Sequence, residues 1–307
     1  MSMFSITVPA STANLGPGFD SAGLALNLYL TLHVEKSEHW EFVHESVHLP
    51  PAPDASEHLI YKTAERTANL YHSTLPPCKV IMESDIPLAR GLGSSASAII
   101  AGIELANQLC ELSLSIEEKL RIATDIEGHP DNVAASLYGG LVITSQLPNG
   151  DIEVFKKTDA ELDFIVYIPV VELKTEDARK VLPEQFTRNE AAKASAVGNV
   201  MIAALVSGNY ELAGKMMEED LFHEPYRSSL IPNYSEIREE AKIAGAFGTV
   251  ISGAGPTMIS FTSKGKGQEV AAQLQNLLSS HQVSVLKMDS DGSSVNLDVN
   301  NFKAFGI

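Results

Sequence analysis

The chain has 307 residues, of which 44% are hydrophobic, and this is enough to bury the core of one large or two ordinary domains. Its 22 Lys and Arg residues against 39 Asp and Glu give a formal net charge of −17. Such a field repels nucleic acid and anionic membrane surfaces, so neither is an expected partner. An acidic chain that binds an anion must gather its few cations and backbone N–H groups at one place.

The redox state and the location of the protein follow from local features. The two cysteines, Cys78 and Cys110, match no metal or redox spacing, so we expect both to be reduced. The first residues show no charged segment followed by an apolar one, and no apolar run approaches about 20 residues. We therefore expect a cytoplasmic protein without a membrane span.

Strand and helix patterns follow one another irregularly in the first half of the chain. They predict strands at 4–11 and 24–36, a helix at 57–71, a strand at 78–87, helices at 94–109 and 115–128, and a strand at 139–146. The helix at 115–128 has the clearest ends, because Ser115 and Glu118 form a capping-box pattern and Gly128 stops it.

The second half begins with the apolar run 164–173, which predicts a strand. The patterns then predict helices near 176–181, 190–206, 209–219 and 234–244, a strand and turn at 248–261, a helix at 266–280 and a strand at 283–289. We place a domain boundary near residue 160, which gives domains 1–160 and 161–307. The irregular order favours an α+β fold over a doubly wound sheet.

Two weaker signals point to ordinary structure. "DSDGSS" (289–294) lacks the glycine and the closing glutamate of a calcium loop, so we predict a hairpin turn between "VSVLKM" and "SVNLDV". Four histidines in and after the second predicted strand fit no single face and predict no metal site: His33, His39, His44 and His48.

The stretch "PLARGLGSSAS" (87–97) has the composition of an anion-binding loop. Gly91 and Gly93 permit a tight turn and close approach of the backbone to a ligand, and Ser94 and Ser95 stand where a helix begins. The first N–H groups of a helix lack intrahelical partners and carry partial positive charge, so they bind an anion without a lysine. A Gly-Ser turn that merely caps a core helix has the same composition, so the loop alone leaves both interpretations open.

Companion motifs elsewhere in the chain resolve that choice. "PASTANLGPGFD" (9–20), "PLARGLGSSAS" and "GTVISGAGPT" (248–257) resemble, in order, the three motifs of the GHMP kinases. Within that family, four segments are most similar to the homoserine kinases: "LGPGFD", "EGHPDNVA" (127–134), "ELKTEDARKVLP" (172–183) and "FHEPYRSSLIP" (222–232). The resemblance covers most of the chain.

The resemblance implies an N-terminal ribosomal-protein-S5-like domain, a C-terminal ferredoxin-like domain and a site in the cleft between them. It implies that ATP is the phosphoryl donor and that Ser95 and Glu127 hold Mg²⁺, a hard cation that prefers oxygen ligands. The loop residues implied to surround the ATP phosphates are Pro87, Leu88, Ala89, Arg90, Gly91, Leu92, Gly93, Ser94, Ser95, Ala96 and Ser97.

The implied acceptor is L-homoserine, which carries a carboxylate, an ammonium and a terminal hydroxyl. Arg179 and Arg227 are the expected carboxylate clamp, because guanidinium binds carboxylate bidentately. Asp20 and Asp131 are candidates for the ammonium. Further substrate contacts are expected from Asn14, His129, Thr175 and Gly253.

No general base is expected. The position at which some relatives carry an aspartate base is Asn132, so the resemblance implies catalysis by orientation and electrostatics, with Asn132, Arg179 and Asp20 as the catalytic set. The chain departs from the family at Lys174, where a small hydroxyl residue usually precedes Thr175.

Two alternative functions and the oligomeric state remain open at this point. The chain could phosphorylate another small molecule, such as mevalonate, shikimate or a sugar. It could also be a nucleotide-binding regulator without catalysis. Some relatives dimerise, so a homodimer is a further expectation.

Overall fold

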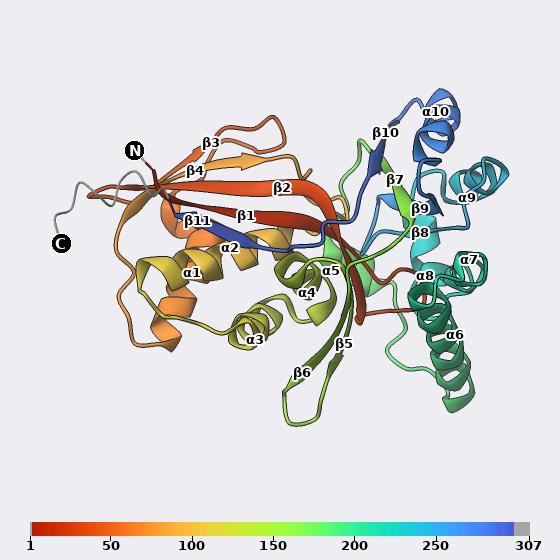
Figure 1. The fold of residues 1–307 in the computed structure, drawn as a ribbon, viewed down its shortest axis with the longest axis horizontal. Coiled ribbons are helices and arrows are strands. Elements are labelled where there is room, and N and C mark those ends of the chain that lie inside the picture. The colour runs from red at the N-terminus through yellow and green to blue at the C-terminus, as the bar shows by residue number, and fades with distance from the viewer. Residues whose placement is uncertain (1, 298–307) are drawn as a thin grey trace.

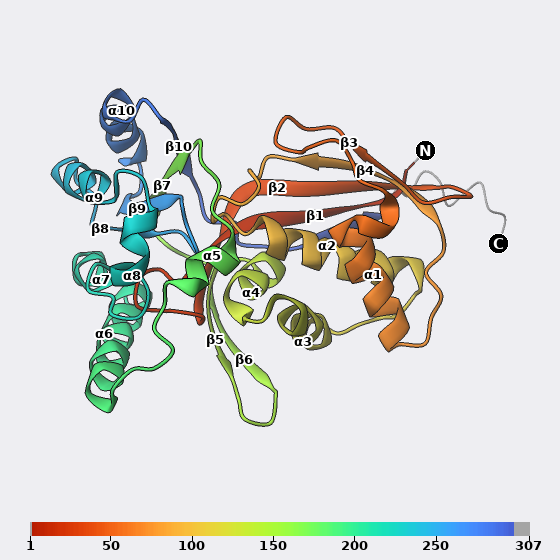
Figure 2. The ribbon, with the colours of Figure 1, turned by 180° about the vertical axis from the view of Figure 1, so that it is seen from behind.

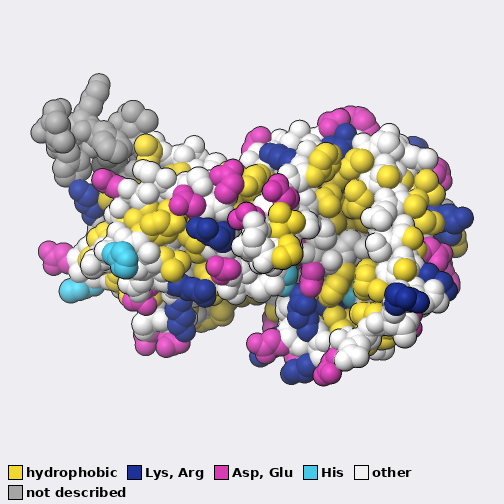
Figure 3. All heavy atoms as spheres, turned by 90° about the horizontal axis from the view of Figure 1, so that it is seen from below, with side chains coloured by type: hydrophobic (Ala, Val, Ile, Leu, Met, Phe, Trp, Pro, Cys, Tyr) yellow, Lys and Arg dark blue, Asp and Glu magenta, His cyan; other side chains and the backbone are white. Residues whose placement is uncertain are grey.

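The computed structural model describes residues 2–297, which form two β-sheets side by side with helices packed on them (Figure 1). The space-filling view shows two lobes joined at a narrower waist (Figure 3). The first sheet has the order β11-β1-β2-β4-β3, and the hairpin β5–β6 extends it from one end of β2. Its strands are β1 (Ser2–Ala13), β2 (Ala22–Lys36), β3 (Glu41–His44), β4 (Cys78–Ser84), β5 (Leu141–Gln146), β6 (Ile152–Lys157) and β11 (Ser294–Leu297).

Helices cover one face of this sheet (Figures 1 and 2). They are α1 (Leu59–Leu70), after the short turn η1 (Ala55–Glu57), α2 (Ser94–Leu109), α3 (Ile116–Glu127) and α4 (Pro130–Tyr138). Helix α2 is apolar around most of its circumference, as expected for a helix with neighbours on every side. It lies between β1 and the helices α1 and α3, and this burial fixes the position of its N-terminus.

The second sheet is antiparallel and has the order β10-β7-β9-β8. Its strands are β7 (Leu162–Pro169), β8 (Gly248–Ile251), β9 (Met258–Ser263) and β10 (His281–Leu286). Every residue of β7 is buried, because Phe164 and Val166 join the core shared with the first sheet, whereas Ile165 and Tyr167 pack into a second core. Helices α9 (Tyr234–Ile243) and α10 (Gly267–Leu277) complete that second core.

The remaining helices lie toward the outer end of the second sheet or at the junction. Helices α6 (Arg188–Val206) and α7 (Tyr210–Met217) pack against each other at the outer end, whereas α5 (Thr175–Lys180) lies where the two sheets meet (Figure 2). The short helix α8 (Glu224–Arg227) is followed by the turn η2 (Ser228–Leu230). The two short helices α5 and α8 therefore carry the segments that the sequence assigns to the substrate clamp.

Most predicted elements are confirmed, and the α+β, two-domain fold is as expected. The predicted hairpin around residues 289–294 is wrong: β10 pairs with β7 in the second sheet, but β11 pairs with β1 in the first. The chain thus returns to the N-terminal sheet, and the division 1–160 and 161–307 stays a prediction. Helix α4 and strand β6 were not predicted. Helix α4 is short and begins within the polar segment 127–132. Within residues 2–297, no helix is long and apolar enough to cross a membrane.

Candidate active site

A cavity of about 630 Å³ opens where the two sheets meet. Strands β2 and β4 and the loop before α2 form one wall, and α5, α8 and the turn after β8 form the other. Every residue predicted to bind or orient the acceptor lines it: Asn14, Asp20, His129, Asp131, Asn132, Thr175, Arg179, Arg227 and Gly253. The fold thus brings together motifs that are up to 239 residues apart.

The phosphate loop leads from β4 into α2 through a tight, left-handed path. Ala89, Gly91 and Gly93 have φ values of 52°, 74° and 70°. Gly93 is the N-cap of α2, and a Cβ there would lie 2.1 Å from Oγ of Ser11, so no side chain fits. The helix N-terminus faces the cavity with Ser94 and Ser95 in its first turn. This geometry suits an anion.

The predicted loop residues divide into three groups. Those that line the cavity are Leu88, Ala89, Gly91, Gly93, Ser94 and Ser95. The side chains of Leu92, Ala96 and Ser97 are buried in the core instead, and Pro87 and Arg90 line a neighbouring groove. For these last five residues, contact with ATP stays a prediction, and their side chains do not line the cavity.

Arg90 has a structural task. Its guanidinium donates to the carbonyl oxygens of Pro169 at 3.1 Å, Val170 at 2.7 Å and Leu88 at 2.9 Å. These bonds tie the loop to the end of β7 and leave Arg90 directed away from the cavity.

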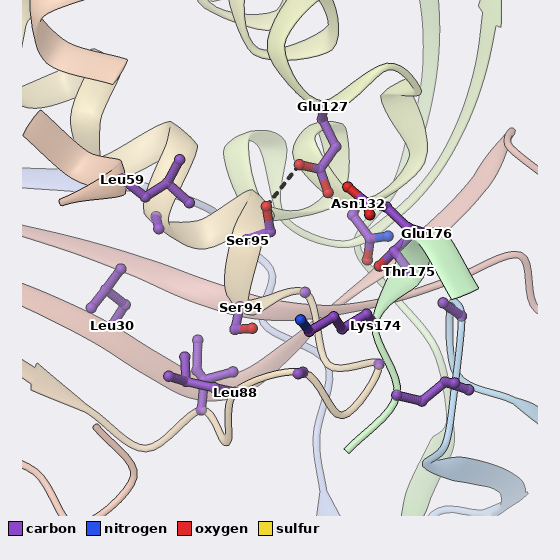
Figure 4. A pocket seen from close by; sticks show the side chains of 18 of the residues that line it. Leu30, Leu59, Leu88, Ser94, Ser95, Glu127, Asn132, Lys174, Thr175 and Glu176 are labelled. Atoms are coloured by element: carbon purple, nitrogen blue, oxygen red, sulfur yellow. Dashed lines mark hydrogen bonds between the residues drawn. The ribbon is translucent and has the colours of Figure 1, made fainter. Parts of the chain in front are cut away.

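Ser95 and Glu127 meet across the cavity wall (Figure 4). The Ser95 hydroxyl donates to Oε2 of Glu127 at 2.9 Å. Glu127 is in the last turn of α3, where a carboxylate opposes the helix dipole. A hydroxyl and a carboxylate beside an anion-binding helix end are the donor set expected for a magnesium–phosphate complex, so these residues fit the metal that the sequence predicts.

The far end of the cavity is apolar and was not predicted. It is lined by Leu30, Leu59, Met82, Ile86, Leu88 and Ala98, together with His44 and His58. Such a surface suits the base of a nucleotide. The residues come from β2, β3, β4, the start of α1, the loop before α2 and α2 itself, and no local pattern in the sequence connects them.

The two histidines at this end form a defined hydrogen-bond chain. Nδ1 of His58 accepts from the backbone N–H of Ile60, so Nε2 of His58 donates to Nε2 of His44 at 3.0 Å. Nδ1 of His44 then donates to the carbonyl oxygen of Pro50 at 2.7 Å. Burial, followed by the charge of His44, lowers the pKa of His58 to about 4, so its ring is neutral at pH 7.

Opposite charges face each other at the acceptor end. Nη2 and Nη1 of Arg179 donate to the two carboxylate oxygens of Asp20 at 2.7 and 3.3 Å. The pair is partly exposed to the cavity, with 37% of the Arg179 side chain and 35% of the Asp20 side chain accessible. A ligand that enters here meets an acid and a guanidinium already side by side.

Arg227 is the second guanidinium, and only 1% of its surface is exposed. It donates to the carbonyl oxygens of Ala178 at 3.0 Å and Gly253 at 3.3 Å, and to Nδ1 of His223 at 3.3 Å. Burial and the charge of Arg179 lower the pKa of Arg227 to about 10, which leaves it protonated at pH 7.

Two residues that support the guanidiniums were missed by sequence reasoning. The ring of Phe19 lies 5.7 Å from the guanidinium carbon of Arg179 and 5.4 Å from that of Arg227. Nε2 of His223 donates to the carbonyl oxygen of Gly16 at 3.0 Å, which leaves Nδ1 to accept from Arg227. Both residues belong to motifs that the sequence singled out, but their neighbours became visible only in the fold.

Asn14 and Asn132 have different surroundings. The Asn14 amide donates to the carbonyl oxygen of Gly253 at 2.9 Å and accepts from the backbone N–H of Asp20 at 3.0 Å, so it joins two loops. Oδ1 of Asn132 accepts from the Ser11 hydroxyl at 3.0 Å, and Ser136 donates to Ser11 at 3.2 Å. These hydroxyls hold the Asn132 amide with its NH₂ group available to the cavity.

His129 and Asp131 form a close pair, with 2.6 Å between Nδ1 and Oδ1. Burial alone would lower the pKa of His129, but the hydrogen bond and charge of Asp131, together with the charge of Asp20, outweigh it and raise the pKa. The folded chain therefore gains stability from this pair below about pH 6.5, and loses it as the pH rises through the folded pKa of His129.

We expect the substitution Asp131→Asn to lower the pKa of His129, because an amide supplies no negative charge. The midpoint can be followed by NMR through the Cε1 proton of the ring. The control is Asp125→Asn, which removes an exposed acid of α3. An equal shift in both variants would show that net charge, and not the contact with Asp131, sets the pKa.

The chain matches the description "GHMP kinases N terminal domain" over residues 58–140 and "GHMP kinases C terminal" over residues 201–280. These ranges contain the phosphate loop, Glu127, Arg227 and Gly253. The fold, the phosphate loop and these matches define a GHMP kinase.

The relatives narrow this further. A homoserine kinase from Oceanobacillus iheyensis is 54% identical over 96% of this chain and 99% of its own length, and one from Bacillus velezensis is 48% identical over 95% and 94%. A putative homoserine kinase structure from Listeria monocytogenes is 41% identical, has a TM-score of 0.81 and covers 95% of this chain and 98% of its own. The chain therefore belongs to the homoserine kinases.

More distant structures support the fold alone. The mevalonate kinase of L. major has a TM-score of 0.70 with 15% identity, over 93% of this chain and 96% of its own.

Proposed function

We propose that the protein transfers the γ-phosphoryl group of ATP to the terminal hydroxyl of L-homoserine, giving O-phospho-L-homoserine for threonine synthesis. The observation that carries this proposal is the Asp20–Arg179 pair at the acceptor end, with Arg227 beside it. A zwitterionic α-amino acid carries both a carboxylate for the guanidinium and an ammonium for the acid.

The pair can open to receive such a substrate. The substrate carboxylate replaces Asp20 as the partner of Arg179, and the substrate ammonium replaces Arg179 as the partner of Asp20. One ligand atom each of Asp20, His129 and Asp131 lies within 4.8 Å of the other two, which suits a cation of this size. Each charge that the substrate displaces is replaced by a charge of the same sign, so neither member of the pair is left without a partner.

The donor side follows from the loop and the metal ligands. Backbone N–H groups at the start of α2 bind the phosphates, and Ser95 and Glu127 would hold Mg²⁺. Bound Mg²⁺ would neutralise charge on the phosphate oxygens. The apolar end near Met82 and His58 takes the adenine.

Transfer itself needs orientation more than base catalysis. The homoserine hydroxyl oxygen bonds to the γ-phosphorus while the bond from that phosphorus to the β–γ bridging oxygen breaks, and ADP leaves with the bond's electron pair. The NH₂ group of Asn132 orients the hydroxyl, and the hydroxyl proton passes late to a phosphoryl oxygen. A loose transition state makes early removal of that proton unnecessary.

Other acceptors fit the site less well. Mevalonate and shikimate lack an ammonium for Asp20 and Asp131, and a neutral sugar has no carboxylate for Arg179. A regulator without catalysis would have no use for Ser95 and Glu127 joined at the phosphate loop.

We expect the purified protein with ATP and Mg²⁺ to release ADP with L-homoserine, and at least about a hundredfold more slowly with L-serine, mevalonate, shikimate or galactose. The measurement is coupled ADP release at equal acceptor concentrations. Faster turnover of another acceptor would keep the kinase and discard the substrate. Nucleotide binding without turnover of any acceptor would favour the regulator.

A further inference from the structure

We propose that Lys174 binds the γ-phosphoryl group of ATP and supplies, from α5, the cation that the phosphate loop itself lacks. The inference rests on the proposed function, because it assigns a residue to the nucleotide of that reaction. It is carried by the placement of the side chain.

The backbone next to Lys174 is joined to the phosphate loop. The N–H of Leu173 donates to the carbonyl oxygen of Ala89 at 3.0 Å. Lys174 follows directly, lines the cavity, and directs its ammonium toward Ser94 at the start of α2 (Figure 4). In the same view the Glu176 carboxylate is directed away from Lys174, toward Glu127 and Asn132. The ammonium therefore faces the end of α2 that binds an anion.

Lys174 has no bonded partner among the residues that the structure describes, although its charge is the smallest of the influences named for the lowered pKa of Asp177. No hydrogen bond or ion pair joins its ammonium to another residue in the range 2–297, and it caps α5 through its backbone alone. Lys180 on the same helix is paired with Asp177 at 2.7 Å, and Arg90 is used by carbonyl oxygens. In a chain of net charge −17, a free ammonium beside an anion site has an anionic ligand as its natural partner.

The position of Lys174 along the cavity indicates that it binds the γ-phosphoryl group. The apolar nucleoside end lies on one side of Ser94, and Thr175 and Arg179 of the acceptor end follow Lys174 on α5. Lys174 thus stands between the donor and acceptor ends, where the group that is transferred must lie. There its charge offsets the negative charge of the three γ-phosphoryl oxygens, both in the bound nucleotide and during transfer.

The test compares Lys174→Met with Lys180→Met, which removes the same charge from the same helix at a solvent-exposed position. Binding of a non-hydrolysable ATP analogue, of ADP and of AMP is measured by calorimetry with Mg²⁺ present. For Lys174→Met we expect the Kd of the ATP analogue to rise at least about tenfold, and those of ADP and AMP to change less than about threefold. Lys180→Met should match the unmodified protein.

Steady-state kinetics add a second readout. We expect kcat with homoserine to fall at least about tenfold in Lys174→Met, with the KM for homoserine within about twofold, and Lys174→Arg to recover most of the loss. A side chain that merely packed would not be rescued by charge. Since Lys174 makes no side-chain cap, its removal should leave the thermal midpoint unchanged.

Three results would overturn the inference: unchanged affinity for the ATP analogue, equal losses for the analogue and ADP, or a loss confined to the homoserine KM. Failure of the proposed function has a different signature. The unmodified protein would then bind the ATP analogue in a Lys174-dependent manner but would not phosphorylate homoserine.

Discussion

Replacing Gly91 by alanine is expected to lower the free energy of unfolding by about 3 kcal/mol and to weaken ATP binding more than tenfold. Gly91 has φ +74°, and a Cβ there would lie 2.3 Å from the carbonyl oxygen of Ser252 and 2.8 Å from that of Gly255. Both are backbone atoms, so they cannot rotate away. The left-handed conformation costs about 1 kcal/mol for alanine, and the close approach adds about 2 kcal/mol.

The substitution also weakens nucleotide binding, because two motifs are in contact at Gly91. The Ser252 hydroxyl donates to the carbonyl oxygen of Gly91 at 2.6 Å, so the turn after β8 supports the phosphate loop. A methyl group between them would push the loop away from that support and displace the N–H groups at the start of α2. Urea denaturation gives the stability, and calorimetry with an ATP analogue gives the affinity.

Gly150→Ala is the matched control. Gly150, in the turn between β5 and β6, also has a positive φ, +90°, but a Cβ added there would meet no atom within 4 Å. We expect this substitution to lower the free energy of unfolding by about 1 kcal/mol, the cost of the left-handed conformation alone, and to leave ATP affinity unchanged. If Gly91→Ala cost no more than Gly150→Ala, the contact between the two motifs would not be rigid.

The phosphate loop could be predicted from the sequence because its chemistry is local. Two glycines followed by serines and an apolar helical run specify a tight turn and an exposed helix N-terminus within about ten residues. The same holds for the capping box of α3, where Ser115 and Glu118 bond each other's backbone as expected. In such segments the residues that matter are neighbours in the chain.

The other features of the site and the fold depend on contacts between residues far apart in the sequence. His44 accepts a hydrogen bond from His58. Nothing near His44 in the sequence indicates this bond, because His58 is in another element. Arg227 is almost fully buried, since the carbonyl oxygens that satisfy it come from α5 and the turn after β8, and nothing near it in the sequence indicates this burial. The return of β11 to the first sheet likewise depends on pairing with β1, which local periodicity cannot specify.

Replacing Arg179 by methionine is expected to lower kcat/KM for homoserine by about 10²- to 10³-fold, which corresponds to about 3–4 kcal/mol. Methionine keeps the unbranched stem but removes the guanidinium that pairs with Asp20 at 2.7 Å. The protein should stay folded, because a half-exposed ion pair contributes at most about 1 kcal/mol to stability. Arg188→Met, at the exposed start of α6, is the control and should retain full activity.

A truncated substrate separates carboxylate binding from a general loss of activity. 3-Amino-1-propanol has the hydroxyl and ammonium of homoserine but no carboxylate, so the unmodified protein should turn it over poorly. If Arg179 binds the carboxylate, Arg179→Met should reduce activity on this compound by less than about threefold, because the compound has no carboxylate for Arg179 to bind. Equal losses on both substrates would mean that Arg179 acts through Asp20 alone. In that case Asp20→Asn would reproduce the loss, and Arg227 would be left as the carboxylate ligand.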